Sequence, residues 1–234
     1  ASAVVEFQMP TPTQTARLTP IDGGTPAAGG SSIHGQTVAV SGTTIFVGAP
    51  GERAVYVYVR DGSGGWPHFQ KIPSPGAPGD GFGRALAASG DRLLVGALPA
   101  AYFYEYDAAK ALWELVDDHT STTASNFGNA VAMDRDYAVV GASNYDFSGA
   151  ETGAAYVFTW NGSKWVADGF LRPLDLGAGY EFGHSVSIAG TTIAASASRF
   201  LLGAPPGTGG AGKGYIYDRI GGVWQLSLIH ISEP

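Results

Sequence analysis

The sequence predicts an all-β fold, a β-propeller made of four-stranded antiparallel blades. The first observation behind this prediction is an internal repeat, in which one phrase returns four times along the 234 residues. Intervals of 48, 45 and 55 residues between its glycines are typical of an architecture in which one small unit is copied. The second is the content of 35 glycines and 14 prolines, which favours many tight turns over long helices. The glycines of the four copies are Gly35, Gly83, Gly128 and Gly183.

Each copy contains four short apolar segments that are separated by turn residues. Asn161-Gly162, between the last two segments of the third copy, is a strong hairpin signal because both residues tolerate a positive φ. Four such segments predict a meander of four antiparallel strands, which is one propeller blade. In the third copy the segments are Ala130–Met133, Tyr137–Ala142, Ala154–Trp160 and Lys164–Leu171.

The strands of one blade are expected to differ in their surroundings. The apolar run Thr44–Ala49 is typical of a strand that is covered on both faces, and the aromatic alternation of Tyr102–Tyr106 is typical of a strand between blades. The repeat glycines are expected to have a positive φ or to permit a close approach of two backbones. One tryptophan per copy is expected to open the fourth strand and to pack between blades. These are Trp66, Trp113, Trp165 and Trp224.

Composition disfavours several classes of partner. The chain has a net charge of −7 and no cluster of Lys and Arg, so we expect no nucleic-acid partner. No apolar run approaches the ~18 residues that a membrane span needs, so we expect no membrane insertion. The absence of cysteine excludes disulfides, thiolate metal sites and a cysteine nucleophile.

These residues resemble the FG-GAP repeat family, which is known from the integrin α-subunit head and from bacterial surface and secreted proteins. The resemblance covers residues 17–225 and implies a seven-bladed propeller, of which about four blades are present. The family's calcium loop would lie between the FG strand and the GAP strand, and the connections here are too short to hold it. The chain is therefore similar to the short-turn bacterial branch. The matching motifs are Phe82-Gly83, Phe127-Gly128, Phe182-Gly183 and Gly48-Ala49-Pro50.

The resemblance also divides the chain. Residues 1–16 are expected to be an N-terminal segment or the remnant of a preceding blade, and the repeats of residues 17–225 start near residues 33, 82, 127 and 182. Residues 226–234 resemble the translation of an adapter used in DNA sequencing libraries, and are expected to be a non-native tail. Four copies cannot complete seven blades, so we expect a fragment whose remaining blades belong to the full-length chain.

One segment of the third copy is a candidate calcium loop. Its residues have the spacing of the DxDxDGxxD pattern, with softer oxygen ligands at several positions. Calcium needs six or more oxygens around a sharp turn, which alternating polar side chains and a glycine supply. The alternative is a polar loop that is rich in turn residues. The candidate ligands are Asn144, Asp146, Ser148 and Thr152, with Gly149 at the turn.

Other motifs carry less chemistry. The glycine-rich segment Gly207–Gly214 matches a phosphate-binding spacing, but no Ser or Thr follows Lys213 and the next residues are typical of a strand, so we expect a plain loop. The histidines lack the spacing of a zinc site. Asp80 and Glu181 precede repeat glycines, and a propeller enzyme would need such carboxylates to converge from several blades.

We expect a non-catalytic binding or adhesion module of a bacterial surface or secreted protein, extracellular or on the cell surface, with a protein or glycan ligand. The first places to look are the loops at residues 143–153 and 198–214, because propellers bind ligands through loops at one end. One alternative is a fragment of a propeller-fold polysaccharide hydrolase or lyase, and another is a structural spacer domain. No cofactor is expected apart from the candidate calcium.

Overall fold

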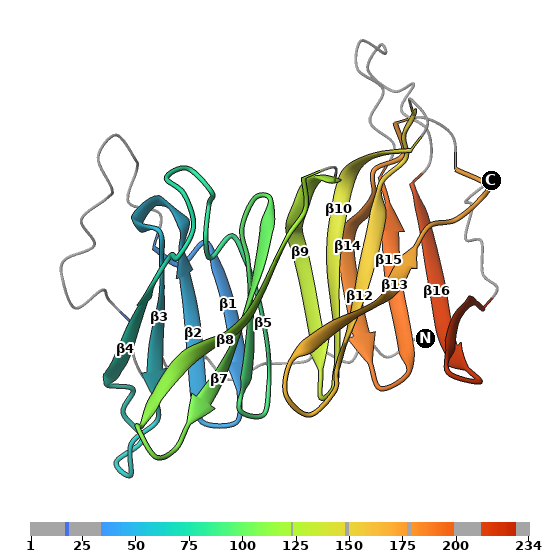
Figure 1. The fold of residues 1–234 in the computed structure, drawn as a ribbon. Helices are drawn as coiled ribbons and strands as arrows, with labels where there is room; N and C mark the ends of the chain where they lie inside the picture. The colour runs from blue at the N-terminus through green and yellow to red at the C-terminus, as the bar shows by residue number, and fades with distance from the viewer. Residues whose placement is uncertain are drawn as a thin grey trace, which may run out of the picture.

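The chain folds into four antiparallel sheets that follow one another in a row (Figure 1). This computed structural model describes residues 17–18, 34–122, 124–147, 150–176, 179–198 and 212–227. In each sheet the strands pair in sequence order, so every repeat forms its own meander, which we call a blade. The predicted all-β propeller fold with about four blades is confirmed.

Blades 1 and 2 contain four strands each, in the order first to fourth along the chain. In blade 1 a short 3-10 turn, η1 (Pro50–Glu52), separates the second strand from the third. Blade 1 contains β1 (Thr37–Ser41), β2 (Thr44–Ala49), β3 (Ala54–Val59) and β4 (His68–Pro73). Blade 2 contains β5 (Ala85–Ser89), β6 (Arg92–Gly96), β7 (Ala100–Asp107) and β8 (Leu112–Thr120).

Blades 3 and 4 repeat this order with longer first strands. A short additional strand, β11 (Ala150–Glu151), pairs with the end of the second strand of blade 3. Blade 3 contains β9 (Ala124–Asp134), β10 (Tyr137–Phe147), β12 (Ala154–Trp160) and β13 (Trp165–Leu171). Blade 4 contains β14 (Phe182–Ala189), β15 (Thr192–Ala197), β16 (Lys213–Ile220) and β17 (Val223–Leu226).

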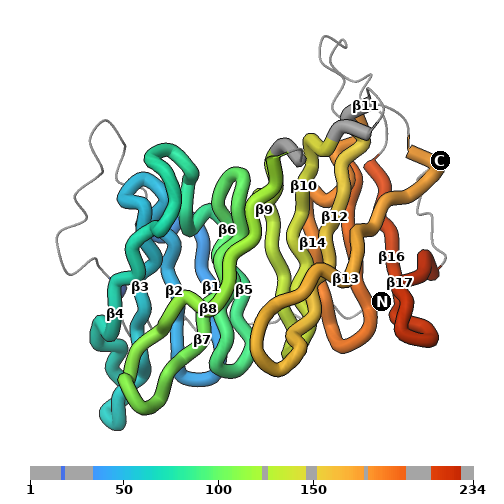
Figure 2. The backbone as a smooth tube through the Cα atoms, viewed as in Figure 1, coloured from blue at the N-terminus to red at the C-terminus, as the bar shows by residue number. Residues whose placement is uncertain are grey.

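Successive blades contact one another through their first strands. β1 contacts β5, β5 contacts β9, and β9 contacts β14, which is the arrangement of inner strands in a propeller. The hairpin turns that join first to second strands and third to fourth strands all lie at the same end of the molecule, the lower edge in Figures 1 and 2. We call this end the hairpin end.

The hydrophobic core consists of three layers, each between two blades. Between blades 1 and 2, Phe46 and Val57 pack against Leu93 and Val95, and all four are fully buried. Equivalent layers join blade 2 to blade 3 and blade 3 to blade 4. The second strands of blades 2 and 3, β6 and β10, are buried on both faces, as predicted, because each lies between two such layers. In blade 4, β15 is buried on one face only.

The repeat glycines allow the backbones of neighbouring blades to touch. Gly83 has a φ of +89°, and its carbonyl oxygen lies 2.1 Å from the point that a Cβ on Gly48 would occupy. The same approach recurs from Gly128 to Gly96 at 2.3 Å. At the third interface it joins Gly183 to Gly141 at 2.0 Å. The predicted positive φ and close approach are therefore both confirmed, and the FG glycine of one blade meets the GA glycine of the blade before it.

The recurring tryptophans pack between blades, as predicted. The Trp113 ring meets the Phe46 ring of blade 1 edge to face, with centroids 4.9 Å apart. Gln70 of blade 1 binds the Trp113 backbone twice, because its Oε1 accepts from the N–H at 2.7 Å and its Nε2 donates to the carbonyl at 3.0 Å. Trp165 likewise packs against Phe103 of blade 2, but here the two rings are stacked, with centroids 4.8 Å apart.

Two expectations need correction. Trp66 does not open the fourth strand of blade 1, because Pro67 lacks a backbone donor and β4 begins only at His68. The segment from Asn144 to Thr152 is not an irregular loop either. β10 continues to Phe147 and pairs with β11, so most of this segment is an extended hairpin.

Candidate functional site

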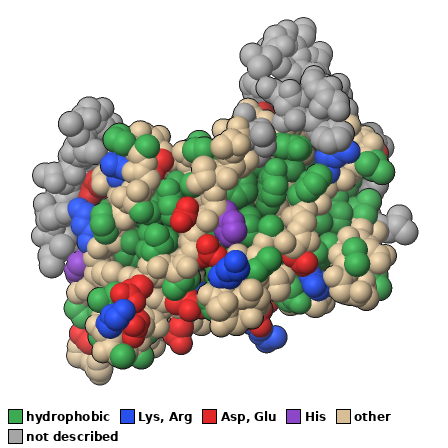
Figure 3. All heavy atoms as spheres, in the orientation of Figure 1, with side chains coloured by type: hydrophobic (Ala, Val, Ile, Leu, Met, Phe, Trp, Pro, Cys, Tyr) green, Lys and Arg blue, Asp and Glu red, His purple; other side chains and the backbone are tan. Residues whose placement is uncertain are grey.

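The hairpin end presents the molecule's candidate binding surface. Charged side chains of both signs gather near the lower edge of the face in Figure 3, where the turns lie in Figure 1. Hydrogen bonds between a strand end and the next blade's first turn hold this edge in place. Ser41 Oγ donates to the Gly90 carbonyl at 3.0 Å, and Arg135 N donates to Ser89 Oγ at 2.9 Å. The surface is therefore a rigid one.

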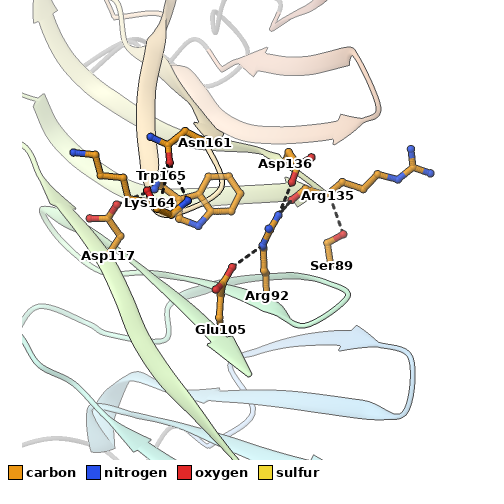
Figure 4. Close-up of polar contacts among 10 residues, drawn as sticks. Ser89, Arg92, Glu105, Asp117, Arg135, Asp136, Asn161, Lys164 and Trp165 are labelled. Atoms are coloured by element: carbon orange, nitrogen blue, oxygen red, sulfur yellow. Dashed lines mark hydrogen bonds and ion pairs between the residues drawn. The ribbon is translucent and has the colours of Figure 1, made fainter. Parts of the chain in front are cut away.

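Arg92 is the centre of a polar cluster between blades 2 and 3 (Figure 4). Its Nε donates to Glu105 Oε1 on the neighbouring strand at 2.9 Å. Its Nη1 donates to Asp136 Oδ1 at 2.7 Å and to the Arg135 carbonyl at 3.0 Å, both on blade 3. One guanidinium thus joins two blades with charge-assisted hydrogen bonds.

Aromatic rings of blade 3 cover the same guanidinium. Its carbon lies 4.7 Å from the centroid of the Trp160 ring and 5.6 Å from that of the Trp165 ring. Trp160 and Trp165 are directly paired across β12 and β13, so they present their rings side by side. The result is a slot formed by rings and carboxylates that a planar cation fills.

The interface between blades 3 and 4 contains a similar cluster with the roles exchanged. Here the cation is Arg219 of blade 4, which forms an ion pair with Asp168 of blade 3. Its guanidinium carbon lies 5.1 Å from the Tyr137 centroid and 5.6 Å from the Trp224 centroid. Arg219 and Trp224 pair across β16 and β17 as Trp160 and Trp165 do across β12 and β13. Two interfaces therefore hold an arginine of the chain itself.

The interface between blades 1 and 2 has the rings without the arginine. Tyr106 and Trp113 pair across β7 and β8, with ring centroids 5.6 Å apart. Thr44 stands at the register position of Arg92, and Val59 opposite it stands at the position of Glu105. A groove of about 550 Å³ lies at this interface, which we call the blade 1–2 groove. Its lining is Ser41, Gly42, Thr43, Thr44, Val59, Phe69, Gly90, Asp91, Tyr106 and Trp113.

A second groove of about 650 Å³ adjoins the first and shares Gly90, Asp91 and Tyr106 with it. Arg92 and Glu105 line this second groove. Together the two grooves form a surface that extends across the hairpin end of blades 1 to 3. The carboxylate of Asp91 is exposed between them and has no hydrogen-bond or ion-pair partner among the described residues.

The predicted calcium ligands lie at the opposite end of blade 3. Asn144 and Asp146 belong to β10, and Ser148 lies outside the described residues. Ser143 Oγ donates to Asn144 Oδ1 at 3.4 Å. Thr152 is buried, and its Oγ1 has no hydrogen-bond partner in the part of the chain that the structure describes. Calcium binding by these residues stays a prediction.

Asp80 and Glu181, the carboxylates that an enzyme would use, both have partners within the protein, and for Asp80 these include Arg53 of blade 1, whose Nε lies 3.8 Å from Asp80 Oδ1. Asp80 is buried, accepts from Ser74 Oγ at 2.7 Å, and accepts from the Phe82 backbone N–H at 3.1 Å. Glu181 Oε2 accepts from Ser198 Oγ at 3.0 Å. In these contacts the two carboxylates fix the backbone around the repeat glycines.

The other sequence motifs are also placed. Lys213 and Gly214 belong to β16 and not to a helix N-terminus, and Lys213 Nζ donates to Asp175 Oδ2 at 2.9 Å. The rest of the segment from Gly207 lies outside the described residues, apart from Gly212. His119 Nε2 donates to the Trp165 carbonyl at 3.1 Å. Over the described residues, no group of three or more His, Cys, Asp or Glu is placed to hold a metal ion.

Sequence reasoning did not identify the grooves at the hairpin end. The ring pairs are formed across strands, and sequence spacing does not display which residues face one another. One signal was available in the aligned copies, because the position that opens the second strand changes from Thr44 to Arg92, Tyr137 and Thr192. A position that varies in charge and size within an otherwise regular repeat marks a place where the interfaces differ.

Comparison with protein-family models finds the FG-GAP repeat in residues 66–107 and 119–158. This match confirms the resemblance that the motifs indicated. A search of curated proteins finds no match. In the described part of the chain, no helix has the length and hydrophobicity that crossing a membrane requires.

Solved structures are similar in fold only. A protein from Lactobacillus plantarum has a TM-score of 0.51 and 14% sequence identity, with 81% of this chain and 54% of that one covered. A chain in the complex of an S. cerevisiae Dbp5 variant with Nup159, a Gle1 variant, IP6 and ADP has a TM-score of 0.47 and 12% identity. That comparison covers 82% of this chain and 46% of the other. The chain thus spans about half the length of these structures.

Proposed function

Because this chain carries FG-GAP repeats, we propose that it is a non-catalytic binding module of an extracellular or cell-surface protein. The observation that supports this function best is the surface formed by the two grooves at the hairpin end. It combines a rigid backbone with an exposed carboxylate, Asp91, and with a ring, Phe69, of which 37% is exposed. Concave surfaces with a few polar groups among aromatic side chains are typical of ligand sites.

The local bonds of Asp80 and Glu181 favour binding over hydrolysis of a polysaccharide. A hydrolase needs two carboxylates that face the same bond from separate positions. Each of these carboxylates instead has partners of its own. Asp80 binds Ser74, the Phe82 backbone N–H and Arg53 of blade 1, and Glu181 binds Ser198 at the other end of the β14–β15 hairpin. The groove surface contains three carboxylates. Glu105 is paired with Arg92, Asp134 accepts from the Gly190 backbone N–H, and Asp91 is exposed.

The test measures binding by the full chain to two panels of probes, an array of polysaccharides and a set of immobilised synthetic peptides of differing charge. We expect at least one probe to bind, and the Phe69→Ala variant to weaken that binding about tenfold, since a stacking ring contributes on the order of 1 kcal/mol. Leu174→Ala, at a residue that is 89% exposed and outside both grooves, is the control. Release of reducing ends from any polysaccharide would overturn the non-catalytic assignment, and binding that Phe69→Ala leaves intact would overturn the location.

A further inference from the structure

We propose that the blade 1–2 groove binds an arginine side chain of a partner protein. This inference rests on the proposed binding function and assigns a ligand to it. The support comes from the internal repeat, because at each of the other two interfaces between blades the chain's own side chains place an arginine against aromatic rings. Between blades 2 and 3 the occupant is Arg92, and between blades 3 and 4 it is Arg219.

Both occupied slots contain the same three components, a guanidinium, a pair of aromatic rings and a carboxylate. Arg92 lies against Trp160 and Trp165 and pairs with Asp136. The blade 1–2 groove keeps two of the three components. Its rings are Tyr106 and Trp113, which correspond by strand register to Trp160 and Trp165.

Asp91 supplies the carboxylate. It stands in the first turn of blade 2, and Asp136 stands at the same position in the first turn of blade 3, directly before the second strand. Asp136 binds Arg92 of the preceding blade at 2.7 Å. At the register position of Arg92 the preceding blade carries Thr44, whose side chain has no charge to pair with Asp91. The Asp91 carboxylate, which lines the groove, is therefore able to accept hydrogen bonds from a ligand.

Charge and shape favour guanidinium over other ligands. The ten residues that line the groove include one acidic residue and no Lys or Arg. The chain as a whole has a net charge of −7, which attracts a basic partner. A guanidinium is planar, so it can lie flat on Tyr106 and Phe69 while the N–H groups in its plane donate to a carboxylate; an ammonium is a compact charge without a flat face to stack. The ring centroids of Phe69 and Tyr106 lie 6.1 Å apart, so Phe69 extends the aromatic surface of the groove.

A double substitution in blade 1 can imitate the bound state within the chain itself. The variant Thr44→Arg with Val59→Glu reproduces the Arg92–Glu105 pair at the equivalent register positions. We expect the new arginine to fill the groove, to raise the melting temperature by several degrees and to prevent binding of an external arginine. The matched control is Thr192→Arg, at the equivalent position of blade 4, where no described blade presents rings to it. That variant exchanges the exposed hydrogen bond from Thr192 Oγ1 to Asp218 for a charge beside the same carboxylate, and it should leave arginine binding unchanged.

Binding is measured by NMR titration of the full chain with N-acetyl-arginine amide, with the lysine and citrulline analogues as comparisons. We expect saturable shifts at Trp113 and Asp91 with the arginine probe and at least tenfold weaker binding of the other two. Asp91→Asn should weaken arginine binding at least tenfold and should not lower the melting temperature, because no described residue binds the Asp91 carboxylate.

Three outcomes would overturn the inference. They are failure of the arginine probe to bind, equal binding of arginine and citrulline, and undiminished binding by the Thr44→Arg, Val59→Glu variant. If a polysaccharide binds, Phe69→Ala weakens that binding and the arginine probe does not bind, the proposed binding function stands and the assignment of arginine fails. If neither class of probe binds, both fail.

Discussion

The carbonyl oxygen of Gly183 lies 2.0 Å from the point that a side-chain carbon at position 141 would occupy. The obstacle is backbone, which cannot move aside as the end of a flexible side chain can. Glycine at this position is therefore required by the neighbouring blade, and a sequence comparison of one blade alone would not reveal the reason. The same argument holds for Gly48 and Gly96 at the other interfaces.

At the residue scale we predict that Gly141→Ala lowers the free energy of unfolding by about 2–3 kcal/mol, as overpacking of a tight contact does. The matched control is Gly214→Ala, a strand glycine with nothing within 4 Å of its added Cβ. That change should leave stability unchanged or raise it by about 0.5 kcal/mol, because alanine is less flexible in the unfolded chain. Urea denaturation of both variants measures the difference. Equal losses would show that the close approach does not limit the side chain at residue 141.

At the scale of strands, side chains on the fourth strand of one blade form hydrogen bonds with the backbone N–H and C=O of a tryptophan on the fourth strand of the next. Gln70 binds both polar groups of Trp113. In the next interface Asp117 accepts from the Trp165 N–H at 2.9 Å, while His119 donates to the Trp165 carbonyl. Different residues thus satisfy the same two backbone groups, so the contact is preserved although the side chains change.

We predict that Gln70→Ala destabilises the chain by about 1–3 kcal/mol, since it leaves a donor and an acceptor of Trp113 unpaired at a largely buried site. Gln225→Ala is the comparison, because Gln225 makes only an exposed contact of 3.5 Å to Ile220 within its own blade. Thermal unfolding followed by near-UV circular dichroism reports on the tryptophan packing. A similar effect of both variants would count against the role of Gln70 between blades.

In blades 2 and 3, one side-chain oxygen accepts two backbone hydrogen bonds in the turn between the third and fourth strands. Asn161 Oδ1 accepts from the backbone N–H groups of Ser163 and Lys164, each at 3.0 Å. Asp107 does the same for Ala109 and Lys110 in the turn that lacks glycine. The hydrogen bond from Lys110 N is the main reason that the pKa of the Asp107 carboxyl is lowered. An acceptor at the start of the turn can therefore replace the conformational freedom of glycine.

At the scale of the whole molecule, burial of tyrosines in the blade cores makes stability sensitive to alkali. Burial raises the pKa of Tyr104, Tyr215 and Tyr217 above the ordinary value of 10.0. Because the unfolded chain releases these protons at lower pH than the folded chain does, the stabilisation is complete below pH 10 and is lost as the pH rises above it. We predict that the melting temperature falls between pH 10 and 12, and that the share of the tyrosinate absorbance at 295 nm that these three tyrosines contribute appears together with unfolding. Titration of these tyrosines in the folded chain near pH 10 would contradict the prediction.

The fold was largely predictable from the sequence, and the candidate site was not. Four copies of one pattern determine four blades, since the alternation of apolar segments and turns is a local property of each copy. The glycine contacts were predictable as close approaches, although their partners were not. The slot at Arg92 depends on Trp160 and Trp165 of another copy, 68 or more residues away. Such pairings arise from how blades pack, and periodicity does not encode them.

The contact between glycines has a consequence for how such an array grows. Each contact joins the second strand of one copy to the beginning of the next, so its two halves come from adjacent units of the gene. Tandem duplication of one unit produces two junctions whose glycines already match, and no compensating substitution is needed. Ser196 departs from this rule, since it stands where Gly48, Gly96 and Gly141 stand in the other copies. A glycine of a following unit would meet the Ser196 side chain there, so the contact behind blade 4 must differ from the three between the described blades.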